Sequence, residues 1–291
     1  MRIIRYLDGR QTRLAAVTDD EKAYPLPHSD LISLIDEARE KGVSPVRIVE
    51  SAITPQNELT AAWTSLQLLT PVNAPEIWAA GVTYQRSREA RNYEATGGRM
   101  DAETFYDKVY DAVRPEIFLK STAARTVGPN QDVTLRSDSV WQIPEPELGL
   151  VLAGDGTIVG YTAGNDMSCR DIEGENPLYL PQAKIWRKSC SIGPAIRLAD
   201  TVEDPYDFRI VCQIYREGHV VVESEASTSQ LNRKLDELVR FLAADNDLFD
   251  GTVLLTGTAI VPPADFTLAP GDRIEISISG IGTLVNHVIS N

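Results

Sequence analysis

From residue 116 to the C-terminus the sequence consists mainly of short apolar and β-branched runs separated by glycine, proline and aspartate. The runs include EIFLK at 116–120, LGLVLA at 148–153 and FRIVCQIY at 208–215, a pattern typical of short strands. One helical pattern interrupts them at about 228–244, where leucines recur at helical spacing. A chain of this kind cannot form a helical bundle. The pattern predicts a largely β domain, a barrel or rolled sheet with a few helices packed outside it.

The first part of the chain has a different pattern. Three short β-like runs, RIIRYL, TRLAAVT and KAYPL, are separated by Asp-Gly and Asp-Asp turn signals, which predicts an antiparallel meander. Two helices are expected next. The first is capped by Ser29 and ends at Gly42, and the second is capped by Ser44 with Pro45 at its first helical position.

Prolines bracket the stretch TPVNAPEIW, which indicates a linker before the next β-like run. We therefore place a domain boundary near residue 72, with a small α+β domain at 1–72 and the larger domain at 73–291. Between this boundary and the first strand of the β-rich part, the patterns REARNYEA and ETFYDKVYDAV predict two helices around Gly97-Gly98. This segment is expected either to close over a pocket or to form a plain helical hairpin.

Charge and cysteine content exclude several classes of protein. Asp and Glu total 42 against 28 for Lys and Arg, a net charge of -14, and no segment is dense enough in basic residues to follow a nucleic acid. No apolar run is long enough for a membrane span or a secretory signal. The three cysteines are odd in number and form no CxxC pair, which favours reduced thiols. We expect a cytoplasmic protein that binds neither nucleic acid nor membranes.

The stretch IPEPELGL places Glu145 and Glu147 two residues apart in an extended strand, so both side chains point to the same face. Pro144 and Pro146 stiffen this part and remove two backbone donors, which suits the end of a strand. The hairpin signal at 154–156 then brings the following strand back antiparallel, so that Asp166 is expected beside the two glutamates.

Three carboxylates directed at one point repel one another unless a cation is present. An all-oxygen set of this kind suits a hard ion, Mg²⁺ first, with Mn²⁺ or Ca²⁺ as substitutes. The alternative is a solvated acidic strand end that binds nothing. Further along, Gln182 and Lys184 are expected to share a strand face. A lysine beside a bound cation can lose its proton and act as a base, although a lone lysine is more often a surface residue.

The motifs PEPELGLVL, GYTAGNDMSCRD, AKIWRKSCSIGPAI, LLTGTAIVPP and GDRIEISISGIGTLVN follow one another from about residue 76 to the C-terminus. In this order and spacing they resemble the fumarylacetoacetate hydrolase superfamily. The resemblance implies a mixed β-roll that binds Mg²⁺ through Glu145, Glu147 and Asp166 and holds a 2-oxo acid. It also implies that such proteins form homodimers or homotetramers.

One departure from the family pattern bears on the reaction. Hydrolytic members carry an Asn-Tyr-x-x-His-x-x-Glu motif whose histidine and glutamate activate water. The corresponding stretch here begins at Thr83-Tyr84, with Ser87 in place of the histidine and Ala90 in place of the glutamate. None of the three histidines lies near this motif, and Glu89 is one position out of register. This departure argues against hydrolysis of a C–C bond.

A subset of the family lacks this pair and dehydrates 2-keto-3-deoxy sugar acids. The runs RPEIFLK and ENPLYLPQ resemble that subset, which implies conversion of 2-keto-3-deoxy-D-arabinonate to 2,5-dioxopentanoate and water. By motif position the resemblance places the family's lysine, arginine and threonine at Lys184, Arg170 and Thr258. We predict Lys184 as the base at C3 and Glu116 as the acid for the leaving hydroxyl, although these two roles could be exchanged. Other groups are expected to contact the substrate or shape its site: Ser87, Arg170, Gln182 and Thr258.

Two other functions remain open at this point. An acylpyruvate hydrolase or 2-oxo acid decarboxylase would use the same metal site with another proton-transfer group, Glu89 first. A protein without catalytic activity would only bind an organic acid. Glu116 also has a plain structural role available, because it could pair with Arg114 or Lys120 across a strand.

Overall fold

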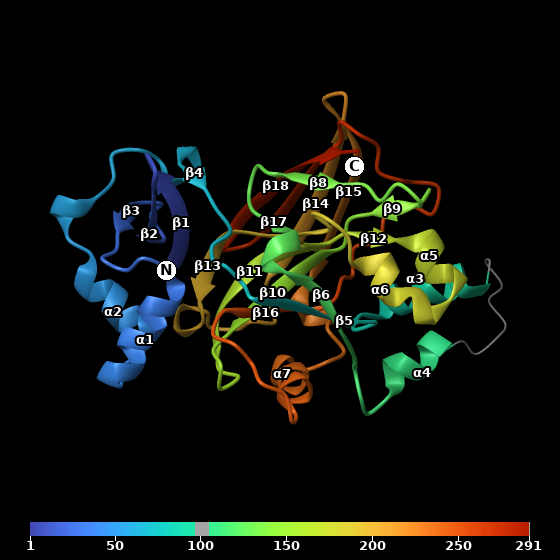
Figure 1. Cartoon of the computed structure of the whole chain (residues 1–291), viewed down its shortest axis with the longest axis horizontal. Helices are drawn as coiled ribbons and strands as arrows, with labels where there is room; N and C mark the ends of the chain where they lie inside the picture. Colours follow the sequence, from blue (N-terminus) through green and yellow to red (C-terminus); the bar gives the residue numbers. More distant parts are fainter. Residues whose placement is uncertain (97–104, 291) are drawn as a thin grey trace.

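The computed structural model describes residues 1–96 and 105–290, which form two large sheets with helices around them (Figure 1). The larger sheet has eleven strands, with the order β3-β2-β1-β13-β11-β10-β16-β5-β6, while β4 pairs with β1 and β7 with β13. Its strands are β1 (Arg2–Asp8), β2 (Gln11–Val17), β3 (Ala23–Pro25), β4 (Gln67–Leu68), β5 (Glu76–Gly81), β6 (Glu116–Thr122), β7 (Thr126–Val127), β10 (Pro146–Leu152), β11 (Ile158–Asp166), β13 (Cys190–Leu198) and β16 (Thr252–Leu255).

The second sheet has the order β15-β14-β17-β18-β8, and a two-stranded ladder joins β9 to β12. These strands are β8 (Asp132–Thr134), β9 (Gln142–Ile143), β12 (Ser168–Cys169), β14 (Arg209–Arg216), β15 (His219–Ser227), β17 (Arg273–Ile278) and β18 (Gly282–Ile289). Buried side chains from both large sheets form one hydrophobic core, which includes Leu148, Leu150, Ile210 and Ile276. The predicted mixed α+β roll is confirmed. The described strands form open sheets, so the alternative of a closed barrel is wrong.

Within residues 1–96 and 105–290, seven α-helices lie around the sheets. They are α1 (Leu31–Lys41), α2 (Pro45–Ala52), α3 (Gln85–Thr96), α4 (Phe105–Asp111), α5 (Arg170–Glu175), α6 (Leu180–Lys184) and α7 (Leu235–Ala243). Helices α1 and α2 lie beside the N-terminal strands, whereas α3, α4, α5 and α6 gather at the opposite end of the molecule (Figure 1). Among the described residues, no helix is long and apolar enough to cross a membrane.

The N-terminal strands form the predicted antiparallel meander, but they also extend the large sheet. Strand β1 pairs with β2 along its whole length, and on its other side Arg2 and Ile3 pair with Arg197 and Ile196 of β13. Residues on both sides of position 72 therefore contribute strands to one sheet. The domain boundary near residue 72 stays a prediction.

Two helix predictions need correction. Helix α1 is capped by Asp30 and not by Ser29, because the Asp30 side chain accepts the N–H of Ser33 at 2.9 Å. The predicted helix at 228–244 is only α7, which begins at Leu235. Thr228–Gln230 form a 3₁₀ turn that does not continue into α7. The chain leaves helical geometry there because Asn232 donates its backbone N–H to Thr83 at 2.9 Å and Leu231 bridges to Tyr84. These tertiary hydrogen bonds replace helical ones.

The β10–β11 hairpin places the acidic residues as the alternation predicts. Glu147 pairs with Gly164, and the backbone N–H of Asp166 donates to the carbonyl of Glu145 at 3.0 Å. Strand β16 pairs with β10 only from Gly149 onward. Pro146, which has no N–H, therefore lies beyond this second ladder, where a missing donor costs nothing.

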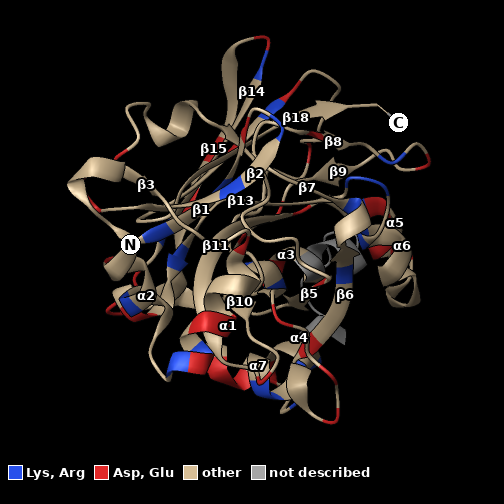
Figure 2. Ribbon diagram, turned by 60° about the vertical axis from the view of Figure 1, so that its left-hand side comes forward, with Lys and Arg blue, Asp and Glu red and all other residues tan. Residues whose placement is uncertain are grey.

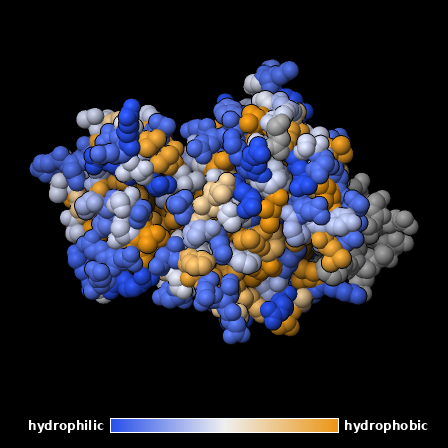
Figure 3. All heavy atoms as spheres, viewed as in Figure 1, coloured by the Kyte–Doolittle hydropathy of each residue, from blue (hydrophilic) through white to orange (hydrophobic). Residues whose placement is uncertain are grey.

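Helices α3 and α4 cover the two patterns predicted as helices after the linker, while Gly97-Gly98 lies outside the described residues. Acidic and basic residues are interspersed along the ribbon, and this view of the described residues shows no continuous basic face (Figure 2). On the face shown in Figure 3, hydrophilic residues predominate over the N-terminal helices, with hydrophobic patches scattered over the central part.

Candidate active site

Glu145, Glu147 and Asp166 meet at one end of the β10–β11 hairpin. Each offers a carboxylate oxygen, and these oxygens lie within 4.8 Å of one another. The three side chains are buried, with 4%, 2% and 1% of their surface exposed. Burial, and then the charges of Asp166 and Glu145, raise the pKa of Glu147 well above its usual value. The backbone N–H of Gly257 donates to Glu147 at 2.6 Å and fixes its orientation.

The donor set fits a hard divalent cation. All three groups offer carboxylate oxygens, a kind of ligand that Mg²⁺ and similar hard cations prefer. Burial and the neighbouring carboxylates, which raise the pKa of Glu147, disfavour its charge unless a cation is bound. Nearby cationic side chains, Lys120, Lys184 and Arg170, partly balance the carboxylates. Sequence reasoning predicted this cluster, and the tertiary structure brings its three members together.

Lys184 lies inside the same cluster. Its Nζ contacts Glu145, lies 3.3 Å from Asp166 and donates to the Ser168 hydroxyl at 2.6 Å. The lysine is the last residue of helix α6, so the prediction that it shares a strand face with Gln182 is wrong. Pro181 at the start of this helix favours helical geometry, and the end of α6 directs Lys184 inward while Gln182 remains exposed.

Arg170 connects the cluster to a carboxylate that sequence reasoning missed. Its guanidinium donates to Glu145 at 2.8 Å and lies 3.7 Å from Glu173. Glu173 is 2% exposed and also lies 3.7 Å from the Lys184 ammonium. Both residues belong to helix α5, three positions apart, so they share one helix face. Glu173 follows Arg170 of the Ser-x-Arg-Asp turn by three positions. This spacing was the signal in the sequence that could have identified Glu173.

Lys120 is the second residue that was missed. It is completely buried on β6 and its ammonium lies 2.7 Å from Asp166 Oδ1. The same ammonium donates to the backbone carbonyl of Met167 at 2.8 Å and to that of Lys184. Lys120 therefore connects two parts of the fold. One is the hairpin on which Asp166 lies, and the other is the end of helix α6. In the sequence it appeared only as a pairing candidate for Glu116, an arrangement that these contacts replace.

Glu116 begins strand β6 and lies directly opposite Gly81 of β5. A Cβ atom at position 81 would lie only 2.0 Å from Glu116 Oε2. The missing side chain of Gly81 therefore leaves the space that the Glu116 carboxylate occupies. Gly81 in turn lines the pocket that contains the acidic cluster. Glu116 is not part of that lining, but its carboxylate lies directly against Gly81.

The pocket contains most of the predicted site residues. Besides the three carboxylates and Lys184, its lining includes Ser87, Thr258, Gly81 and Phe118. Ser87 is held by its own hydroxyl, which donates to the Tyr84 carbonyl at 2.7 Å. Gln182 does not belong to this lining; its backbone carbonyl accepts a hydrogen bond from Arg136 at 3.0 Å.

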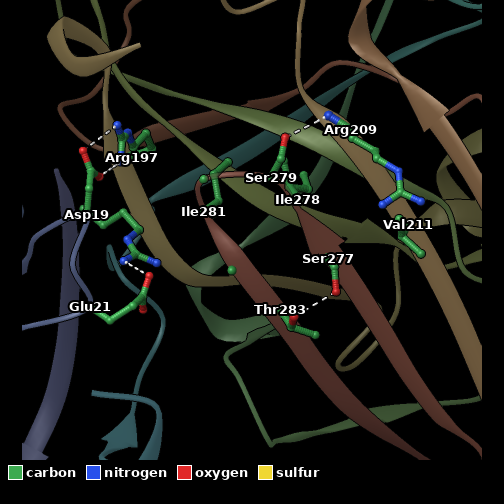
Figure 4. Close-up of a pocket in the computed structure, with 13 residues that line it drawn as sticks. Asp19, Glu21, Arg197, Arg209, Val211, Ser277, Ile278, Ser279, Ile281 and Thr283 are labelled. Carbon is green, nitrogen blue, oxygen red and sulfur yellow. Dashed lines mark hydrogen bonds and ion pairs between the residues drawn. The ribbon is translucent and has the colours of Figure 1, made fainter. Parts of the chain in front are cut away.

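A second polar pocket lies between the N-terminal strands and the turn from β17 to β18 (Figure 4). Its acidic groups are paired: Asp19 contacts Arg197, and Glu21 lies 2.6 Å from Arg2. None of the predicted site residues lines it. The chemistry-bearing groups are thus gathered in the acidic pocket between β5, β6 and the β10–β11 hairpin.

This fold and its carboxylate cluster define a class of protein. Residues 77–289 match the family model described as fumarylacetoacetate (FAA) hydrolase, C-terminal, and the chain belongs to this family.

Individual relatives point to one branch of it. A 2-dehydro-3-deoxy-D-arabinonate dehydratase of Saccharolobus solfataricus is 47% identical over 77% of this chain and 74% of its own. A probable 2-keto-3-deoxyxylonate dehydratase of Haloferax volcanii is 50% identical over 75% of this chain and 73% of its own.

Solved structures from the same branch of the family also resemble this chain. A 2-keto-3-deoxyarabinonate dehydratase in a hexagonal crystal form matches with a TM-score of 0.86 at 36% identity, covering 100% of this chain and 99% of the other. A 2-keto-3-deoxy-D-arabinonate dehydratase complexed with magnesium and 2,5-dioxopentanoate matches with a TM-score of 0.82 at 37% identity, with the same coverage. The predicted resemblance to the dehydratase branch is confirmed.

Proposed function

We propose that this protein is a Mg²⁺-dependent dehydratase that converts 2-keto-3-deoxy-D-arabinonate to 2,5-dioxopentanoate and water. The observation that carries the proposal is the position of Lys184, whose ammonium contacts two of the three clustered carboxylates inside one buried pocket. A metal site and a proton-transfer group thus lie within reach of the same small ligand. The similarity to dehydratases and the magnesium in one of the solved relatives support it.

Glu145, Glu147 and Asp166 would hold the cation. A divalent cation bound there would supply Lewis acidity to a 2-oxo acid and so lower the pKa of its C3 protons. Thr258, whose hydroxyl accepts the backbone N–H of Ile260 at 3.1 Å, borders the pocket and orients the substrate. Arg170 holds Glu145 in place through the 2.8 Å ion pair.

Two side chains of the pocket move protons in this proposal. Lys184 takes a proton from C3, and Glu116 on the opposite wall protonates the departing 4-hydroxyl group. The double bond then shifts toward C5 and the C5 hydroxyl becomes the aldehyde of the product. One water is lost and no oxidant or reductant is needed. Ser87 lies at the position of the hydrolytic histidine and supplies a hydroxyl that is already bonded to Tyr84.

The rival hydrolase reaction needs a group that activates water. Glu89, the candidate for that role, is exposed, accepts a hydrogen bond from Gln85 at 3.0 Å and does not line the acidic pocket. His28 contacts Glu37 beside helix α1. Neither residue is in position to replace the missing histidine, which favours dehydration.

Gly81→Ala is expected to displace the Glu116 carboxylate without unfolding the protein. The new Cβ would collide with the far end of a flexible side chain, so we expect a change of less than about 1 kcal/mol in the free energy of unfolding. We expect kcat to fall about 100-fold, as for Glu116→Gln. Kinetics of both single variants and of the double variant check this. If the losses in kcat of the two single variants added fully in the double variant, Gly81 would not act by making room for Glu116.

The proposed reaction is tested with metal-stripped protein, 2-keto-3-deoxy-D-arabinonate, its L-epimer and fumarylpyruvate, each with and without Mg²⁺. Product masses identify the reaction. We expect Mg²⁺-dependent loss of one water from the keto-deoxy pentonate. Cleavage of fumarylpyruvate without any dehydration would overturn the proposal and establish a hydrolase.

The partner of the protein in this proposal is a small 2-oxo acid. We further propose that it acts in the cytoplasm as a homodimer or homotetramer. The three cysteines are free and buried, which suits a reducing compartment. Sedimentation analysis of the purified protein tests the oligomeric state, and a monomer at micromolar concentration would contradict it.

A further inference from the structure

A cavity of about 430 Å³ opens between helix α4 and the segment that joins α5 to α6. In Figure 1 these elements face each other beside the start of β6. Most of the cavity lining is apolar and consists of Val109, Ala112, Pro115, Pro177, Leu178 and Leu180.

This cavity adjoins the acidic pocket. Glu116 and Glu173 belong to its lining, and each lies against a residue that lines the acidic pocket. The Glu116 carboxylate lies against Gly81, and Glu173 lies 3.7 Å from the Lys184 ammonium. A chain molecule with one end at Glu145, Glu147 and Asp166 would therefore pass Glu116 and continue into the apolar cavity.

The α4 side of the cavity is firmly anchored. Arg233, which is 8% exposed, donates to the carbonyls of Val109 and Tyr110 at 3.3 Å and to that of Ala112 at 2.5 Å. These bonds attach the end of α4 to the chain that precedes α7. The wall is thus a fixed part of the fold.

We infer that this cavity receives the far end of the substrate and, among 2-oxo acids longer than five carbons, selects those whose chain ends in an apolar group. The inference rests on the proposed function. It adds a substrate class to the pentonate: 3,6-dideoxy-2-oxohexonates, whose C6 is a methyl group. A methyl group gains from burial against this wall. A hydroxyl at C6 would instead exchange water for apolar neighbours and lose its hydrogen-bond partners.

The added reaction balances in the same way as the first. A proton leaves C3 and the 4-hydroxyl departs with a proton as water. A proton then leaves C5 while C3 regains one, which moves the double bond to C4–C5 and gives an enol. The enol hydroxyl loses its proton and C4 gains one, so C5 becomes a carbonyl. The product is 2,5-dioxohexanoate, a methyl ketone, where the pentonate gives an aldehyde.

The first test measures binding without turnover. The probes are 2-oxobutanoate, 2-oxopentanoate, 2-oxohexanoate and 2-oxoheptanoate, which lack a 4-hydroxyl and cannot be dehydrated. They are titrated calorimetrically into the Mg²⁺-loaded protein. We expect Kd to fall about fourfold for each CH₂ added beyond the fifth carbon. A series with constant Kd would overturn the inference.

Substitutions in the cavity wall test whether the dependence of Kd on chain length arises there. Leu180→Asn, and Val109→Thr on the opposite side, are expected to flatten the chain-length series. Val113→Ser is the matched control, because Val113 is 86% exposed and lies outside the lining. An unchanged slope in both wall variants would place the tail elsewhere and refute the inference.

The second test compares turnover of the 6-deoxyhexonate with that of the 6-hydroxy hexonate of the same stereochemistry. We expect kcat/KM to be about tenfold higher for the 6-deoxy compound, and equal or inverted values would overturn the inference. The two proposals fail separately. A rising affinity series without dehydration of any sugar acid refutes the dehydratase proposal, and dehydration of the pentonate with a flat series refutes the cavity assignment.

Discussion

Glu147→Gln is expected to weaken metal binding and activity strongly while making the metal-free protein more stable. Burial among two other carboxylates raises the pKa of Glu147, so its charge is unfavourable without a cation. Glutamine has the same shape and can still accept the Gly257 N–H. We expect the Mg²⁺ affinity to fall at least about 100-fold and kcat about 1000-fold. The free energy of unfolding of the metal-free protein should rise by about 1–2 kcal/mol.

Calorimetric titration with Mg²⁺ and thermal unfolding after metal removal measure the two effects in the same sample. The matched control is Glu203→Gln, because Glu203 is exposed on the surface and should change neither quantity. A variant that retains Mg²⁺ affinity would show that Glu147 is not a ligand. A lower melting temperature would show that its charge stabilises the metal-free fold.

Lys120→Met is expected to cause the largest loss of stability among substitutions near the site. Lys120 is fully buried, and its removal would leave Asp166 Oδ1 without the ammonium that now lies 2.7 Å away. Breaking a buried ion pair by removing one partner costs about 3–5 kcal/mol. The carbonyls of Met167 and Lys184 would also lose a donor. Mg²⁺ bound beside Asp166 should restore part of the loss.

Urea unfolding with and without Mg²⁺ checks this prediction. Lys22→Met serves as the control, because Lys22 is 47% exposed and its ion pairs with Asp20 and Glu58 are 3.6 and 3.7 Å long. We expect that variant to lose less than about 1 kcal/mol in its free energy of unfolding. Equal losses for the two lysines would mean that the buried pair contributes no more than a surface pair.

Local patterns predicted the features that depend on neighbours in the chain. The alternation of Glu145 and Glu147 in an extended run, and a hairpin that returns Asp166, follow from the two-residue period of a strand. The family motifs identified the fold and the dehydratase branch, and the relatives confirm both. The replacement of a histidine by Ser87 was likewise visible in the sequence.

Local patterns failed where distant segments compete for the same backbone groups. Leucine spacing predicted a helix from about residue 228, yet Leu231 and Asn232 bond to Tyr84 and Thr83 of another segment. The pattern around Gln182 and Lys184 predicted a strand, whereas the structure has the short helix α6. Its five residues are too few to show a helical period.

Residue types at short spacing were enough to predict the acidic hairpin, the family and the expected metal chemistry. Tertiary packing alone places Lys120 against Asp166, Glu173 near Lys184, and Glu116 in the space that Gly81 leaves. Each of these contacts joins segments that lie apart in the chain. Strand pairing and helix packing set such distances, and no local periodicity encodes which buried faces will meet.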